Sequence, residues 1–438
     1  MVLLKNFGNI FKIPELTRKL LFTLGVLVVY RIGSFIPAIG INVQLLAEHM
    51  AKASTFRGIL SFFDTFSGGS LQYCTIFALG ISPYITASIM MQMLSMTIPS
   101  LEALMKEGDY GRRVINQYTR YLALILSVGY SFAYAMYLSN ANATTTPGLL
   151  VSPGWGFNFL FTLSLTVGCM FTMWLGEQIS LFGVGNGSSM IIFAGIVARF
   201  PSLFAQVLTL HPIKALMVLL VFIAITGCIV FLEKGDRKIS VQYARRIIGQ
   251  RVYGGQSTYI PFKINTGGVM PVIFASSVLN IPAFIIGLLG ERFPFLKPVA
   301  ASLAGTGFLY NAVLFALIIF FTYFYTAIVF NPTELADNIK KSGGFIPGIR
   351  PGKQTADFFD FILTRIGLVG AIYLGALAIA PNIVGAMLNL PFAVSGTSLL
   401  IMVGVALEVS AQIESYLIEY KYGSFLSSGQ RIKSKVTR

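Results

Sequence analysis

The 438-residue chain has few charged residues, only two histidines and only three cysteines. Charged residues make up 11% of it, against about 25% in a typical soluble domain, whereas 55% of its residues are hydrophobic. Its mean hydropathy is +0.75. A water-facing surface cannot be built from so few charges, so the composition excludes a soluble globular protein and predicts a membrane protein.

The cysteines and histidines do not form any familiar metal or disulfide pattern. Cys74, Cys169 and Cys228 lie far apart and form no CxxC pair, and His49 and His211 fall outside the long apolar runs. The sequence also has no Walker glycine loop, no HExxH motif and no GxSxG motif. We therefore expect no metal, no cofactor and no enzymatic activity, and any energy source must come from a partner.

Ten apolar runs are long enough to cross a hydrocarbon core of about 30 Å. They cover residues 20–39, 73–95, 121–138, 157–175, 187–209, 213–232, 267–290, 307–330, 361–380 and 396–417. The sequence thus predicts an all-α integral membrane protein with ten transmembrane helices. Most of its 32 Lys and Arg residues lie in the two tails and in alternate connections, so both termini are predicted to face the cytoplasm.

Two of the predicted cytoplasmic connections are long and basic. Residues 233–266 contain Arg245, Arg246 and Arg251, and residues 331–360 contain Arg350 among glycines and prolines typical of ordered turns. Such loops serve either as topology signals alone or as a docking surface for a partner. Their size favours docking.

A short motif recurs in the second and seventh runs. Residues 80–88 and 268–276 both read G-x-x-P-x-I-x-A-S. Because the two runs are five spans apart, they cross the membrane in opposite directions, which predicts two inverted halves, 1–210 and 211–438, with a functional path at their interface. Chance recurrence of proline-containing helices is the alternative.

Polar side chains lie near each copy of the motif. They are Thr86, Ser88 and Gln92 in the second run, and Ser276, Ser277 and Asn280 in the seventh. Two pairs have i, i+4 spacing, which places each pair on one helix face. These side chains serve either ordinary interhelical hydrogen bonding or function.

The first external connection contains an apolar segment too short to cross the membrane. Its apolar side chains follow largely helical spacing and precede a pair of glycines: Phe56, Ile59, Leu60, Phe63, Phe66, Gly68 and Gly69. This pattern predicts a short re-entrant helix or one lying at the lipid surface, with a glycine hinge.

The chain resembles the SecY family of protein-conducting channels, bacterial type, along nearly its whole length. The resemblance rests on residues 66–69, 77–85, 183–187, 256–258 and 347–352. It implies a channel in the plasma membrane that passes unfolded secretory proteins or releases apolar segments sideways into lipid. A ten-span secondary transporter of a small solute is the alternative, although the spans offer few ionisable residues for ion coupling.

The resemblance also implies roles for particular positions. A mid-membrane ring of aliphatic side chains maps onto Ile81, Ile85, Ser188, Ile192, Ile273 and Ile401, where Ser188 departs from the usual aliphatic residue. Isoleucines that simply face the core or the lipid are the alternative. A short re-entrant helix near residues 57–71 would be the plug, and the polar faces of the second and seventh spans would form a lateral gate for signal sequences.

The partners implied by the resemblance are protein subunits and a motor. The loops around Arg245, Arg246, Arg251 and Arg350 would dock the SecA motor ATPase or the ribosome, whose RNA phosphates attract basic loops. SecE-like and SecG-like small membrane subunits are implied as well.

Overall fold

The computed structural model describes residues 13–46, 67–144, 147–209, 211–243, 246–248, 251–253, 257–265, 267–289, 307–387 and 395–436. The chain packs into two compact units. The first comprises Met1–Phe204, Ala283–Ala301 and Val405–Arg438, and the second comprises Ala205–Pro282 and Ser302–Gly404.

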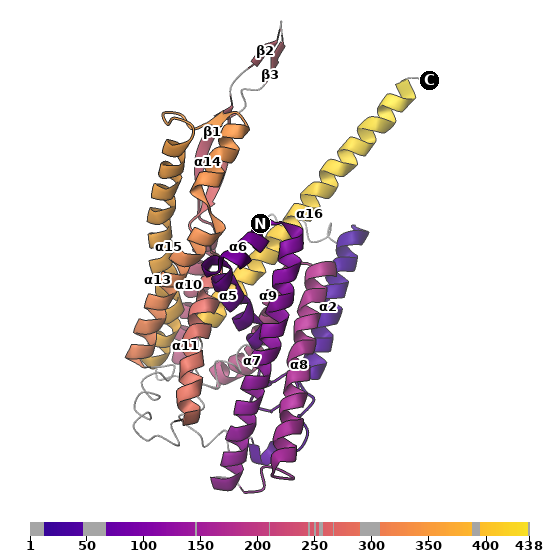
Figure 1. The fold of residues 1–438 in the computed structure, drawn as a ribbon, viewed down its shortest axis with the longest axis vertical. Helices are drawn as coiled ribbons and strands as arrows, with labels where there is room; N and C mark the ends of the chain where they lie inside the picture. Colours follow the sequence, from indigo (N-terminus) through magenta and orange to yellow (C-terminus); the bar gives the residue numbers. More distant parts are fainter. Residues whose placement is uncertain are drawn as a thin grey trace. The chain divides into compact units, whose positions relative to one another are not determined.

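The first unit contains helices α2 and α5 to α9 (Figure 1). Their bounds are α2 (Pro14–Gly33), α5 (Ser82–Thr97), α6 (Pro99–Lys106), α7 (Asp109–Thr144), α8 (Trp155–Phe182) and α9 (Gly187–Leu208). Helix α7 packs against both α5 and α8, and α2 packs against α8. Proline stands in the first turn of α2, α5 and α6, where its missing N–H removes no intrahelical bond.

The second unit surrounds the long helix α15, which runs beside α13 in Figure 1. Its helices are α10 (Pro212–Lys234), α11 (Met270–Leu289), α13 (Phe308–Val329), α14 (Pro332–Lys341) and α15 (Lys353–Met387), although the residues of α11 from Ala283 onward belong to the first unit. Helices α10 and α14 also contact α15. The last helix, α16 (Gly396–Val436), begins in this unit, and its residues from Val405 onward belong to the first.

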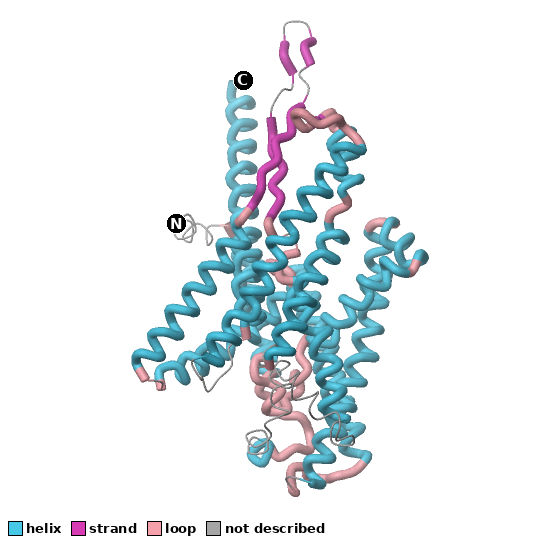
Figure 2. The backbone as a smooth tube through the Cα atoms, turned by 90° about the vertical axis from the view of Figure 1, so that its left-hand side faces the viewer, coloured by secondary structure: helices cyan, strands magenta, loops and turns pink. Residues whose placement is uncertain are grey.

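The connection between α10 and α11 is a β-ribbon, which the all-α expectation missed (Figure 2). Strands β1 (Asp236–Tyr243) and β4 (Ser257–Lys263) pair antiparallel, and β5 (Gly344–Phe345) adds to the other edge of β1. Strands β2 (Arg246–Ile248) and β3 (Arg251–Tyr253) form a second hairpin that continues beyond β1. In the other long connection, 331–360, the glycines and prolines predict ordered turns, and the structure confirms them between α14 and α15.

One face of this ribbon is covered by α14 and the start of α15. Side chains that alternate along a strand point to the same face, and here Ile239, Val241 and Phe262 are buried. They form a hydrophobic cluster with residues of both helices, among them Ile339 and Phe359. The two long basic connections therefore fold together into one packed module.

Each of the ten expected spans falls on a helix, and seven helices in the described part of the chain are long and apolar enough to cross a membrane. The other three fall short for separate reasons: α2 carries charged residues near both ends, α5 has 16 residues, and the described apolar part of α11 is Met270–Leu279.

Two expected spans have the wrong bounds. The first, 20–39, is a helix from Pro14 to Gly33. It begins earlier because the helix continues into polar sequence that hydropathy does not register, and it ends earlier because the apolar residues after Gly33 form turns and a bridge to Thr75. In the second, residues 73–81 form turns, with Cys74 and Gly80 at positive φ, and the helix starts only at Ser82. Apolar content alone does not distinguish a turn from a helix.

Candidate functional site

The six positions of the expected ring occupy equivalent places in four helices. Each lies within the first two turns of its helix or directly before it: Ile81 and Ile85 at α5, Ser188 and Ile192 at α9, Ile273 at α11, and Ile401 at α16. Four of these isoleucines are at most 3% exposed, whereas Ile85 and Ser188 are half-buried. Such burial is expected of a packed core and of a closed constriction alike.

Glycines on α8 set the position of the α5 start. The Cδ1 atoms of Ile81 and Ile191 each lie 3.3 Å from where a Cβ on Gly176 would stand, so the missing side chain makes room for both. One turn earlier, the hydroxyl of Thr172 donates to the Gly80 carbonyl at 3.0 Å. A Cβ on Gly168 would clash with the backbone oxygen of Ile76. The segment before α5 therefore packs directly on the α8 backbone.

The loop from α8 to α9 is held by side chains distant in sequence. Thr23 of α2 accepts from the Val184 N–H at 3.1 Å, and Gln412 of α16 accepts from the Gly185 N–H at 2.7 Å. Gly187 touches the α8 backbone, since its Cβ would overlap the Gly176 oxygen. These contacts fix the first turn of α9, which carries two of the ring positions.

Ser188 is tied into the cap of α9. The Oδ1 of Asn186 accepts hydrogen bonds from the Ser188 backbone N–H at 3.1 Å and from the Ser188 hydroxyl at 2.7 Å. An Asn side chain that accepts from the second N–H of a helix is a standard N-cap. The one polar member of the expected ring therefore has its hydroxyl satisfied within its own turn.

The expected plug lies mostly outside the described residues, which include neither Phe56, Ile59, Leu60, Phe63 nor Phe66. Its glycine pair is described, and both Gly68 and Gly69 have positive φ. The carbonyl of Gly68 accepts from the guanidinium of Arg31 at 3.4 Å. Gly68 also approaches the backbone of Gly195 on α9 so closely that a Cβ would stand 3.0 Å from it. The end of the expected plug segment is thus fixed between α2 and α9.

The residues of the expected lateral gate lie on α5 and α11 as the sequence indicates. Thr86 and Ser276 are buried and donate to backbone carbonyls of their own helices, Ser82 at 3.1 Å and Ile273 at 2.9 Å. Ser88, Gln92 and Ser277 are half-buried. Asn280 lies on α11, and its side chain is outside the described part.

The basic docking candidates lie on the ribbon module. Arg246 and Arg251 stand on β2 and β3, in register with Tyr253 and Ile248, and Arg245 lies outside the described residues. Arg350 is exposed in the turn before α15, and its carbonyl accepts from the buried Thr355 hydroxyl at 2.9 Å. The backbone at Arg350 is therefore anchored while its side chain is free to meet a partner.

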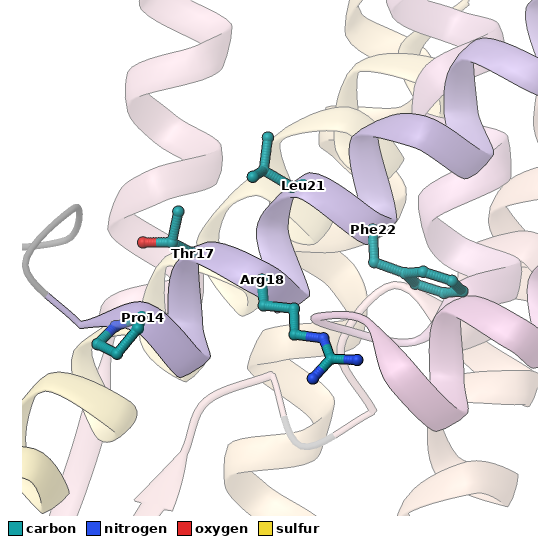
Figure 3. Close-up of a pocket in the computed structure, with 5 residues that line it drawn as sticks. All are labelled: Pro14, Thr17, Arg18, Leu21 and Phe22. Atoms are coloured by element: carbon teal, nitrogen blue, oxygen red, sulfur yellow. The ribbon is translucent and has the colours of Figure 1, made fainter.

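An open hollow lies along the start of α2 in the first unit (Figure 3). It is lined by Pro14, Thr17, Arg18, Leu21 and Phe22. No expected site residue lines it, and its residues offer no nucleophile and base for a reaction.

Sequence reasoning missed the polar contacts at the base of the ribbon and the packing stripe on α8. Gly168, Thr172, Gly176 and Ser180 recur at i+4, a spacing of small residues that is typical of close helix packing in membranes and is legible in the sequence. Asn265, at the end of β4, carried no comparable signal because its partner Glu233 is 32 positions away.

Comparison with known proteins places this geometry in a family. A family model described as SecY matches residues 75–410. The chain is 46% identical over 421 residues to the protein translocase subunit SecY of Escherichia coli (strain K12), covering 94% of each chain. It is 42% identical over 425 residues to the same subunit of Aquifex aeolicus (strain VF5), covering 95% of this chain and 98% of that one.

Solved structures agree on the fold. The structure titled "The structure of a protein conducting channel" matches with a TM-score of 0.62 at 18% identity, over 91% of this chain and 92% of that one. A second match, "Sec61 in the Canine ribosome-channel complex from the endoplasmic reticulum", has a TM-score of 0.59 at 18% identity, with the same coverage.

Proposed function

We propose that this chain, which belongs to the SecY family, passes unfolded secretory proteins across the plasma membrane and releases apolar segments into lipid. It is a multi-pass, protein-conducting channel subunit of a protein translocase. Identity of 46% over 94% of both chains is the observation that carries this proposal. Family membership removes the small-solute transporter as an alternative. The basic connections support a topology with both termini in the cytoplasm.

The proposed constriction consists of aliphatic side chains from the first turns of α5, α9, α11 and α16. Such a constriction gates by resisting water and ions, without needing charge. It also offers no sequence-specific hydrogen bonds, so polypeptides of almost any sequence can pass. The aliphatic character of Ile81, Ile85, Ile192, Ile273 and Ile401 supports this role.

The plug and the lateral gate complete the proposed path. The segment near residues 57–71 seals the channel from outside, and the described glycine pair is its hinge. Signal sequences insert between the polar faces of α5 and α11. Hydrogen bonds between membrane helices average only about 0.6 kcal/mol, so an apolar signal helix can part them.

The two halves, 1–210 and 211–438, are proposed to be inverted repeats. The motif shared by residues 80–88 and 268–276 supports this proposal.

The ribbon module is the proposed docking surface for the SecA motor ATPase or the ribosome, and SecE-like and SecG-like subunits complete the complex. Arg350 supports this proposal, because its side chain is exposed while its backbone is anchored. A planar guanidinium binds a carboxylate or a phosphate through two hydrogen bonds. Contacts to ribosomal RNA phosphates would weaken as salt rises.

We predict that Arg350→Glu abolishes motor-driven translocation while the protein stays folded. The measurement is protease protection of a labelled preprotein in proteoliposomes that contain the channel, the two small subunits, SecA and ATP. Lys341→Glu is the matched control, since it makes the same charge change at another exposed position of the module. Normal protection with Arg350→Glu, or equal loss with both variants, would contradict the docking role.

A further inference from the structure

Asn265 lies at the base of the ribbon, where the chain leaves β4 and approaches α11. Its side chain is 2% exposed. The Nδ2 group donates to the Oε1 of Glu233 at 2.6 Å and to the carbonyl of Gly268 at 2.9 Å. Glu233 belongs to the last turn of α10, and Gly268 lies two residues before α11. One amide therefore joins the end of one helix to the entry of the next.

The residues that flank β1 and β4 are joined to each other at the same point. The Ile264 N–H donates to the Gly235 carbonyl at 3.0 Å, directly beside the Asn265 bridge. Gly370 of α15 fits against the Ile264 carbonyl, from which its Cβ would stand only 2.6 Å. The base of the ribbon is thus held by α10 and α15 and has little freedom to move independently of α11.

The amide of Asn265 can take only one orientation. Rotating it by 180° would turn its oxygen toward a carboxylate and a carbonyl, both of which only accept hydrogen bonds. In the observed orientation its Oδ1 finds no donor among the described residues. The two hydrogen bonds that the amide donates therefore fix the direction in which this side chain faces.

We propose that Glu233 and Asn265 are positioning residues that couple docking on the ribbon to movement of the gate helix α11. This inference rests on the proposed function, because it requires a partner to dock on the ribbon and a gate that includes α11. Force applied to the ribbon reaches its base through the β1 and β4 ladder. From the base, the hydrogen bonds of the Asn265 amide transmit this force to α10 through Glu233 and to the start of α11 through Gly268.

The test uses an environment-sensitive fluorophore on Val278→Cys of α11, in a background where the exposed Cys228 is replaced by Ser. The full complex in proteoliposomes receives the motor ATPase with ATP, and the emission change and motor affinity are measured together. Glu233→Leu removes the acceptor at similar size. Glu233→Gln is the matched control, because its amide oxygen still accepts from Asn265.

We expect docking to change the emission in the parent and in Glu233→Gln. In Glu233→Leu, the emission change at saturating motor should fall roughly tenfold, and motor affinity should change by no more than the coupling factor that the bridge supplied. If Glu233→Leu does not fold, Asn265→Ala tests the same bridge from its other end.

Three results would overturn the proposal: a full emission response in Glu233→Leu, equal loss in Glu233→Gln, or a parent channel that translocates protein without any emission response. The proposed function fails separately, if the parent complex binds the motor but protects no preprotein.

Discussion

Ser188 stands where the other expected ring positions carry isoleucine. The resemblance to the family identified this departure but not its consequence. The structure shows that the Ser188 hydroxyl donates to Asn186 within the α9 cap, 2.7 Å away. The Ser188 side chain is therefore small, and its hydroxyl is satisfied within its own turn. On α9 the proposed constriction thus has aliphatic bulk at Ile192 but not at Ser188.

We predict that Ser188→Ile reduces ion leakage through the idle channel. Burying an isoleucine side chain is worth about 1.5–3 kcal/mol, so the closed state should leak roughly tenfold less or better. The measurement is ion efflux from proteoliposomes without substrate. Ser188→Ala is the control, because it removes the hydroxyl without adding bulk. Unchanged leakage in Ser188→Ile would place this side chain away from the constriction.

At the scale of single elements, the helices were the predictable part. An apolar run of about 20 residues in a chain this poor in charge leaves almost no alternative to a spanning helix. The start of α5 could not be predicted, because the turns before it are as apolar as the helix and depend on contacts such as that of Gly168 with the Ile76 backbone. Tertiary packing, which no local pattern encodes, decides where that helix begins.

The ribbon was missed although its pattern was readable. Ile239 and Val241 alternate with the exposed Ser240 and Gln242 along β1, which is the period of a half-buried strand. This strand contains no long apolar run, because its buried positions alternate with polar ones. Its partner surface on α14 and α15 lies about 100 residues further along the chain and leaves no local signal.

We predict that Phe262→Ala destabilises the ribbon module. Phe262 is 1% exposed, and its ring centroid lies 5.6 Å from that of Phe359 and 6.0 Å from that of Phe330. Truncating a buried phenylalanine costs about 3–5 kcal/mol. Limited proteolysis should then cut within residues 236–263 much faster, and motor affinity should fall.

The matched control for Phe262→Ala is Tyr259→Ala, on the same strand but 57% exposed. It should leave proteolysis unchanged. Equal proteolysis of Phe262→Ala and the parent would show that the module does not depend on this core.

At the scale of the whole molecule, the scarcity of charge and the function agree. The proposed gate of aliphatic side chains needs no buried ionisable groups, and the proposed energy source is a partner that docks on the ribbon module. The sequence was sufficient for the span count and the family, because each depends on composition or on contiguous motifs, and the orientation of the termini stays a prediction. The hydrogen bonds that connect the ribbon module to α11 were not predictable, since Glu233 and Asn265 meet only in the folded chain.

The most direct measurement is crosslinking of a preprotein stalled during translocation to photoreactive residues placed one at a time in the channel. We predict strong crosslinks from Ile273 and Ile401, and none from Val369 of α15, which is 61% exposed. Crosslinks from Val369 as strong as those from the two isoleucines, or none from either isoleucine while translocation proceeds, would contradict the claim that the polypeptide passes through this aliphatic constriction.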